Sequence, residues 1–480
     1  MRTVLSLLTL LLLGDSGFAQ AERYELGQRL KAFEKQWDKT TDPKVRTKAL
    51  ADLPKLTGLF FANKFGEAGR TLDEARWILE GKVPSDDEKW AQSLFADVGT
   101  RCLDLNAKEM PVDIKPFYPV KSVQPKSVTV SFTLGKFTEK QTFVIDVLPS
   151  QFSVKFANAK KYDHADSCDT PLRFEVSVNR NIAVTRAIGM GLTSDAESRK
   201  KILDQYRVQA RKVLKADSLE LATAEDRLKI LAEVSRGVIF ETDIMAIQLA
   251  TELAAMIEQR EAGKDYFTVD RPGQFHLSIP NGKTRIPSRL FVPKGLNPAK
   301  PLPIVVALHG AGGSEELFFE GYGDGQIVKL CEKRGWLLVA PRSGLSLVGG
   351  GPPVGEIVDE LATRYPIDLK AVFVVGHSMG AMQTIDAAQK YLGKFAGIAA
   401  FGGGGLIHKP ELFATLPTFI GVGDKDFALG GARNLKKSLE SAQAKAVTYK
   451  EYEGLEHLLI CREALPDAFK LFDDVLKIQK

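Results

Sequence analysis

Hydrophobic residues in the first part of the chain recur at intervals of three and four positions. Leu26, Leu30 and Phe33 show this spacing among charged residues within the stretch 22–107, and it returns over 196–263. Such a repeat places the apolar side chains on one face of a helix. We therefore predict helices over both stretches.

Between these helical stretches, over residues 122–188, the period changes to two. Apolar and polar residues alternate in three runs, at 128–134, 143–147 and 172–178. Strict alternation is typical of a strand with one buried face. We expect a small β-sandwich or sheet here. No internal repeat is visible, which argues against a propeller or a solenoid.

The pattern changes once more after residue 269. Two strand-like runs flank Asn281-Gly282, a pair that favours a hairpin turn. Short runs that are wholly apolar then alternate with helical stretches; the runs lie at 304–308, 336–340, 371–375, 397–401 and 417–422. Strands without a polar face indicate a parallel sheet covered by helices on both sides, so this part belongs to the α/β class.

These patterns predict an α/β catalytic domain preceded by helical and β-rich regions. The expected order is a leader (1–21), a helical region (22–115), a β-rich region (116–195), a second helical segment (196–268) and the α/β domain (269–480).

The first 21 residues have the features of a secretory signal peptide. Arg2 precedes an apolar run of ten residues, 4–13, and Ala19-Gln20-Ala21 supplies a cleavage site after Ala21. A membrane span needs about 20 apolar residues, and Asp15 ends this run too early. We expect a secreted or periplasmic protein without a membrane span in the mature chain.

Composition narrows the class of protein. The 480 residues are 44% hydrophobic and 26% charged, with a net charge of +5, which is typical of a soluble protein of two or three domains. No run of Lys and Arg is present, so we exclude a nucleic-acid partner. The oligomeric state is not readable from these features.

Four cysteines have two alternative interpretations. In an oxidising compartment the simplest pairing joins Cys102 to Cys168 and Cys331 to Cys461, whereas the alternative is four thiols. None has the spacing of a metal ligand, so no metal site is expected.

One motif carries a candidate nucleophile. The apolar run 371–375 leads into Gly376-His377-Ser378-Met379-Gly380, followed by a helical pattern. This is G-x-S-x-G between a strand and a helix, a sharp turn that exposes a serine hydroxyl. A serine needs a base, and in proteins with this strand–turn–helix motif the basic histidine follows the serine in the chain. Of the six histidines, only His408 and His457 follow Ser378. His408 comes too early, so we predict His457 as the base.

The region from Phe275 onward resembles exported α/β-hydrolase esterases, the group of polyhydroxybutyrate depolymerases, feruloyl esterases and dienelactone hydrolase. The segments that carry the resemblance are RLFVPKG (289–295), VVALHGAGG (305–313), GWLLVAPRSG (335–344), RYPIDLKAVFVVGHSMGAM (364–382) and GVGDKDF (421–427). The resemblance implies hydrolysis of carboxylic esters without a cofactor. The implied substrates include esters carried on polysaccharides and polyesters. The residues on either side of His457, Glu456 and Leu458, differ from the glycine or aromatic residue found beside the base in many relatives.

The resemblance also assigns roles to residues. Two carboxylates, Asp424 and Asp426, end the run at 417–422, and the loop pattern G-x-x-D selects Asp426 as the acid. Backbone N–H groups of Ala311 and Met379 are expected to form the oxyanion hole. We expect substrate contacts from His309, Gly310 and His377, with His309 orienting its loop. The glycine-rich stretches 349–353 and 401–405 are expected at the rim of the site.

Two other functions compete with ester hydrolysis. A serine peptidase of the prolyl-oligopeptidase type would keep the same three residues, although such enzymes commonly carry a propeller in front. A non-catalytic binding protein on a hydrolase scaffold would instead act through residues 22–268.

Overall fold

The computed structural model describes residues 17–121, 124–125, 127–156, 166–194, 196–344 and 351–478. Most of the predicted leader and residues 345–350 of the chain, which include the start of the glycine-rich stretch 349–353, lie outside these described residues. The chain forms two compact units, each assembled from separate stretches. Unit 1 comprises residues 1–49, 58–214 and 227–261, and unit 2 comprises residues 50–57, 215–226 and 262–480.

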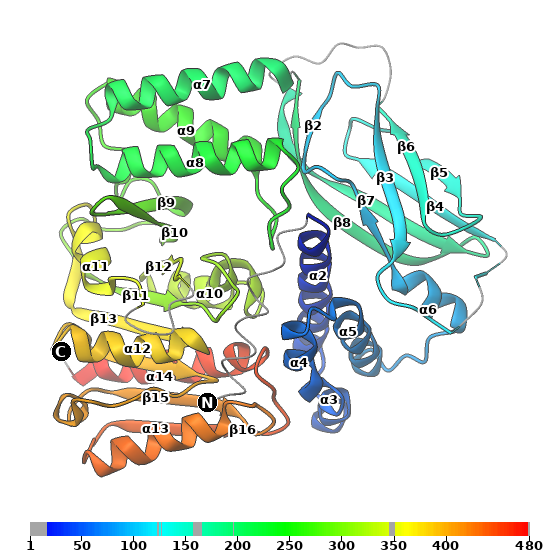
Figure 1. Ribbon diagram of the computed structural model, residues 1–480. Coiled ribbons are helices and arrows are strands. Elements are labelled where there is room, and N and C mark those ends of the chain that lie inside the picture. Colours follow the sequence, from blue (N-terminus) through cyan, green and yellow to red (C-terminus); the bar gives the residue numbers. More distant parts are fainter. Residues whose placement is uncertain are drawn as a thin grey trace. The chain divides into compact units, whose positions relative to one another are not determined.

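Unit 1 contains most of the helices of the N-terminal half (Figure 1). They are α2 (Gly17–Lys39), α3 (Pro43–Leu50), α5 (Phe65–Leu79), α6 (Asp86–Ser93), α7 (Ala196–Val213) and α9 (Ala246–Glu261). Two more, α4 (Leu56–Phe61) and α8 (Leu219–Ser235), belong partly to each unit, as does α3 through its last residue, Leu50. Local sequence fixes some of these ends: Ser85 and Glu88 form a capping box at the start of α6.

Two sheets of unit 1 share one hydrophobic core, so the prediction of a β-rich region is confirmed. The first has the order β1-β3-β6, and the second has the order β2-β8-β7-β4-β5. Val112 and Val154 from the first sheet join Phe132 and Phe174 from the second in the core. The strands are β1 (Leu94–Asp97), β2 (Cys102–Asp104), β3 (Glu109–Pro116), β4 (Val128–Leu134), β5 (Gln141–Val144), β6 (Ser150–Lys155), β7 (Cys168–Val178) and β8 (Asn181–Thr193).

Unit 2 is built on an eight-stranded sheet with the order β16-β15-β14-β13-β11-β12-β10-β9. The predicted hairpin forms the β9 end, with Gly282 at φ +58° in its turn, and the strands from β12 to β16 pair in parallel. The strands are β9 (Gly273–Asn281), β10 (Thr284–Val292), β11 (Leu302–Leu308), β12 (Leu337–Pro341), β13 (Ile367–His377), β14 (Gly397–Phe401), β15 (Thr418–Gly423) and β16 (Val447–Tyr452).

Helices cover the central strands of this sheet, which is why those strands lack a polar face. The helices of this unit are α10 (Gln326–Arg334), α11 (Val354–Ala362), α12 (Met379–Lys390), α13 (Leu429–Ser441) and α14 (Ile460–Ile478), and the unit also contains the short helical turns η1 (Leu53–Lys55), η3 (Leu317–Gly321) and η4 (Pro410–Phe413). This topology confirms the predicted α/β fold with an α/β-hydrolase domain. Within the described ranges, no helix is both long and apolar enough to cross a membrane.

All four cysteines, each in a part of the chain that the structure describes, are thiols. Cys102 and Cys168 face β8 from its two sides, opposite Gly191 and Leu192. Two strands on either side of a third lie about 9–10 Å apart, further than the roughly 4.4–6.8 Å between Cα atoms that a disulfide bridges. The expected pairing of Cys102 with Cys168 is therefore not formed, and Cys331 and Cys461 are likewise buried thiols.

Candidate active site

Ser378 occupies the turn between β13 and α12, as the motif predicts. Its backbone has φ +56° and ψ −114°, and its side chain is half-exposed between the buried His377 and Met379. A Cβ atom on Gly376 would lie 2.1 Å from the carbonyl oxygen of Gly380. The strand and the helix therefore approach so closely that only glycine fits at position 376. The tight crossing exposes the serine hydroxyl at the carboxyl end of the sheet.

The structure brings Asp426 and His457 together. The Nδ1–H group of His457 donates to both carboxylate oxygens of Asp426, at 2.9 and 3.0 Å, and both residues are buried. Because a carboxylate only accepts, Nδ1 carries a proton, and in the neutral ring Nε2 is the nitrogen without one. Nε2 is buried and has no hydrogen-bond partner among the described residues. It is therefore available to accept a proton.

Asp424 has a different environment from Asp426. Its carboxylate accepts the N–H of Gly454 at 2.7 Å, which fixes a turn after β16. The geometry thus favours Asp426 over Asp424 as the acid, although its catalytic role stays a prediction.

The loop after β14 lies against all three predicted catalytic residues. Gly402 has φ +53°, and a Cβ atom there would stand 2.8 Å from Asp426 Oδ2 and 3.1 Å from His457 Nδ1. A Cβ atom on Gly403 would stand 2.8 Å from the carbonyl oxygen of Ser378. The nucleophile, the acid and the base therefore converge on one pair of glycines, in the stretch that we expected at the rim.

The loop that carries Ala311, one of the two predicted oxyanion donors, lies beside the nucleophile turn. A Cβ atom on Gly310 would lie 3.2 Å from Cβ of Ser378, so the loop after β11 borders the nucleophile. The backbone N–H groups of Ala311 and Met379 make no hydrogen bond to any residue that the structure describes. Two unpartnered amides beside a serine are what an oxyanion requires.

His309 is buried, and both of its ring nitrogens are engaged. Nδ1–H donates to the Gly310 carbonyl at 2.8 Å, and Nε2 accepts the N–H of Ser343 at 3.0 Å. Burial lowers the pKa of His309, although its bond to Gly310 opposes the shift. This arrangement fits the expected orienting role and, because both ring nitrogens are engaged, argues against a substrate contact of the His309 ring.

His377 is buried as well, with only 2% of its surface exposed. Its Nδ1 lies 2.8 Å from the Tyr322 hydroxyl, and its Nε2 lies 2.9 Å from the carbonyl oxygen of His457. Since neither nitrogen is left for a ligand, this geometry argues against the predicted substrate contact of His377.

Phe427 and Glu456 lie at the site without having been predicted to do so. The ring of Phe427 is 68% exposed and its centroid lies 4.3 Å from that of His457. The Glu456 carboxyl is buried and bonds to Thr57, and burial raises its pKa to about 8. Phe427 directly follows the predicted acid, and this adjacency was the one sequence signal for it. Glu456 directly precedes the predicted base, and this adjacency was likewise its one sequence signal.

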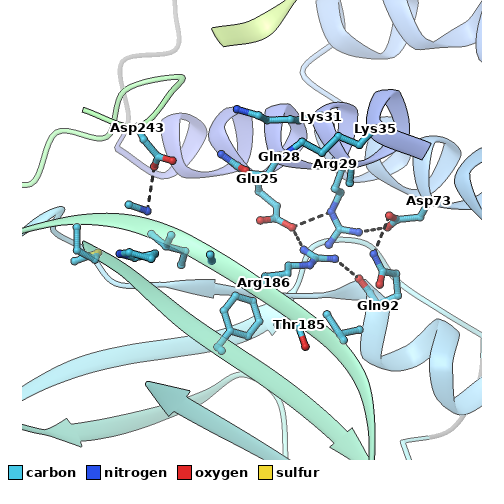
Figure 2. A pocket seen from close by; sticks show the side chains of 18 of the residues that line it. Glu25, Gln28, Arg29, Lys31, Lys35, Asp73, Gln92, Thr185, Arg186 and Asp243 are labelled. Carbon is cyan, nitrogen blue, oxygen red and sulfur yellow. Dashed lines mark hydrogen bonds and ion pairs between the residues drawn. The ribbon is translucent and has the colours of Figure 1, made fainter. Parts of the chain in front are cut away.

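A separate cavity of about 540 Å³ lies in unit 1, beside α2 and strands β7 and β8 (Figure 2). Arg29 and Arg186 both bond to Glu25, and Arg29 also bonds to Asp73. Asp73 further accepts hydrogen bonds from Gln92 and from Tyr118 at 2.9 Å.

These buried charges largely satisfy one another, because each carboxylate is matched by guanidinium or hydroxyl donors. Burial lowers the pKa of Arg186 to about 9. The network therefore ties α2 to α5 and β8, and we assign it a structural role. In the part of the chain that the structure covers, no group of three or more His, Cys, Asp or Glu residues could hold a metal ion.

Comparison with known proteins gives partial matches. No model of a known protein family matches the chain. Probable acetylxylan esterase A of Aspergillus clavatus is 29% identical over 137 residues, covering 25% of this chain and 42% of that protein. Acetylxylan esterase A of Talaromyces purpureogenus is 29% identical over 151 residues, covering 28% and 33%. The chain resembles esterases of the α/β-hydrolase group.

The chain spans less than half the length of these curated relatives. Among solved structures, a feruloyl esterase module from Clostridium thermocellum matches 42% of this chain and 88% of its own, at 14% identity and a TM-score of 0.36. An esterase from Anaeromyces mucronatus, described as a ferulic acid esterase, matches 42% and 89%, at 17% identity and a TM-score of 0.35.

Proposed function

We propose that the protein is an exported serine hydrolase that cleaves carboxylic esters. One observation carries this proposal: His457, bonded to Asp426, and the Ser378 turn meet at Gly402 and Gly403. Nothing about the sheet requires a buried histidine–carboxylate pair at that point, whereas a serine nucleophile requires one.

In the proposed reaction, the Ser378 oxygen attacks the ester carbonyl while His457 Nε2 takes the hydroxyl proton. Asp426 holds the Nδ1–H tautomer and stabilises the imidazolium. The N–H groups of Ala311 and Met379 stabilise the oxyanion until it collapses, and His457 then gives its proton to the departing alcohol. Water, deprotonated by the same nitrogen, attacks the acyl-serine, and His457 returns the proton to the Ser378 oxygen as the acid is released.

Two curated relatives and the surface beside the base support a proposal for the substrate class. Two curated relatives are acetylxylan esterases, so we favour esters carried on a carbohydrate polymer, with polyesters as the second class. The exposed ring of Phe427 supplies an apolar contact next to His457 for the part of the substrate beside the scissile bond.

The test compares the protein with its Ser378→Ala variant on p-nitrophenyl acetate, p-nitrophenyl butyrate and acetylated xylan. We expect turnover by the parent protein and a loss of at least about 10⁴-fold in the variant. Equal turnover by both would refute Ser378 as the nucleophile. Cleavage of peptide p-nitroanilides without ester cleavage would instead support the peptidase alternative. The predicted leader is tested by N-terminal sequencing of the exported protein, for which we expect Glu22 first.

A further inference from the structure

We propose that Tyr322 is a positioning residue that joins the oxyanion loop, the nucleophile turn and the loop of the base through one chain of hydrogen bonds. This inference rests on the proposed function. The chain runs from the Gly310 N–H to the Tyr322 hydroxyl, on to Nδ1 of His377, and from Nε2 of His377 to the carbonyl oxygen of His457.

Tyr322 is held rigidly at the end of the π-helical turn η3. Its N–H donates to the Leu317 carbonyl at 2.7 Å, and 7% of its surface is exposed. Its ring packs edge-on against Phe318 and against His377, with both centroid distances at 4.9 Å. The hydroxyl therefore points to one place, because the ring that carries it cannot turn away without losing both contacts.

The direction of each hydrogen bond follows from the last link. A carbonyl oxygen only accepts, so Nε2 of His377 carries the proton and donates to His457 at 2.9 Å. Nδ1 is then the acceptor, and the Tyr322 hydroxyl must donate to it at 2.8 Å. A lone pair of the same hydroxyl remains for the Gly310 N–H at 3.4 Å, the longest of the three links.

A neutral His377 is needed for this pattern, because a protonated ring would have no acceptor nitrogen. Burial, and secondarily the neighbouring His457, lowers the pKa of His377 well below its usual value. The tautomer and the hydroxyl orientation are thus both determined by the surroundings.

The hydrogen-bond chain joins three residues, and each is either a residue of the proposed active site or the one directly before such a residue. Gly310 precedes Ala311, His377 precedes Ser378, and His457 is the base. No link passes through the Ser378 hydroxyl, the His457 ring or Asp426. The chain fixes the backbone on which those groups stand, and misplacement of reacting groups by about 1 Å costs roughly 100-fold in rate.

The first experiment removes only the hydroxyl, in Tyr322→Phe. We expect kcat for p-nitrophenyl acetate to fall by about 10- to 100-fold with KM nearly unchanged, because ground-state binding does not involve this chain. The matched control is Tyr391→Phe. Tyr391 follows the end of α12 that is remote from Ser378, and its hydroxyl bonds to Glu356 of α11, so loss of this hydroxyl should leave kcat as in the parent protein. A parent-like kcat in Tyr322→Phe would overturn the inference.

The second experiment concerns His377. Gln offers one donor and one acceptor in place of the ring nitrogens, whereas Leu offers neither. We expect His377→Gln to keep more activity than His377→Leu. In the double variant Tyr322→Phe/His377→Leu the two losses should not multiply, since both act through one chain. Losses that multiply would overturn the inference.

A fluorophosphonate probe separates this inference from the proposed function. The labelling rate of Ser378 reports the nucleophile without any ester substrate. No labelling of the parent protein would refute the proposed function. Labelling of the parent and of Tyr322→Phe at equal rates would refute the positioning role alone. We expect the parent to be labelled at least about tenfold faster, with both proteins melting at similar temperatures.

Discussion

Thr57 donates a 2.7 Å hydrogen bond to the buried carboxyl group of Glu456, the residue before His457, across 399 positions of sequence. The other oxygen of Glu456 accepts the N–H groups of Leu458 and Leu459, at 2.8 and 3.1 Å. One carboxyl group therefore fixes both the start of α14 and the loop that carries the base.

Glu456 should make stability depend on pH. Burial raises its pKa from 4.5 to about 8 in the folded protein, so the folded state binds the proton more tightly than the unfolded state. Stability contributed by this group is fully present below pH 4.5 and is lost as the pH rises toward 8, by at most about 1.4 kcal/mol per pH unit. Glu456→Gln keeps the shape and cannot ionise, so urea denaturation should show it gaining on the parent protein between pH 5.5 and 8. A difference that does not change with pH would contradict the raised pKa.

The two neighbouring carboxylates Asp424 and Asp426 should differ sharply on substitution. Asp426→Asn removes the acceptor that fixes the His457 tautomer, and we expect kcat to fall by about 10³- to 10⁴-fold. Asp424→Asn can still accept the Gly454 N–H through its amide oxygen and should keep nearly full activity. Steady-state kinetics on p-nitrophenyl acetate measure both, and comparable losses in the two variants would remove the basis for choosing Asp426.

Gly402→Ala should damage the site rather than merely the fold. Gly402 and Gly393 both have positive φ, +53° and +68°, so each alanine variant carries a similar backbone cost of about 1 kcal/mol. The added methyl group at Gly402 meets Asp426 and His457, whereas at Gly393 it meets nothing within 4 Å. We expect Gly402→Ala to melt at a lower temperature than Gly393→Ala, because its methyl group displaces this buried pair, and to lose turnover even at temperatures where it is still fully folded. Full activity in Gly402→Ala would contradict the assignment of Asp426 as the acid and His457 as the base.

Arg29→Met should destabilise unit 1 strongly. The substitution leaves the carboxylates of Glu25 and Asp73 buried with fewer partners, and breaking such a pair costs about 3–5 kcal/mol. The control is Arg207→Met on α7, whose pair with Asp204 is about half-exposed, for which we expect less than about 1 kcal/mol. Urea denaturation of the three proteins measures this, and equal midpoints for Arg29→Met and the control would show that the network does not stabilise the unit.

Much of the fold could be predicted from periodicity, because the central strands of unit 2 are apolar on both faces. The strands β1, β2 and β3 lie within the stretch 22–115 that was predicted to be helical, and β3 was missed even though Met110, Val112 and Ile114 alternate with polar residues. Two prolines and the preceding helical pattern hid that alternation, and its burial depends on pairing with β1 and β6.

The candidate site was predictable where chemistry imposes a local motif, as for Ser378. Tyr322 and Glu456 could not be found this way. Their partners lie 55 and 399 positions away, and a hydroxyl or a carboxyl group gains its role only from the fold that buries it. The contact of Phe427 with His457 likewise arises from tertiary packing.

The discontinuous make-up of unit 2 limits how the protein can be dissected. A fragment starting at residue 269 would lack the segments 50–57 and 215–226 that belong to this unit. It would leave the Glu456 carboxyl without Thr57, the Ser278 N–H without Thr223, and the Arg364 guanidinium without Glu220. Two short segments from the first half of the chain thus complete unit 2, and a protein split at residue 269 should form this unit only when both fragments are expressed together.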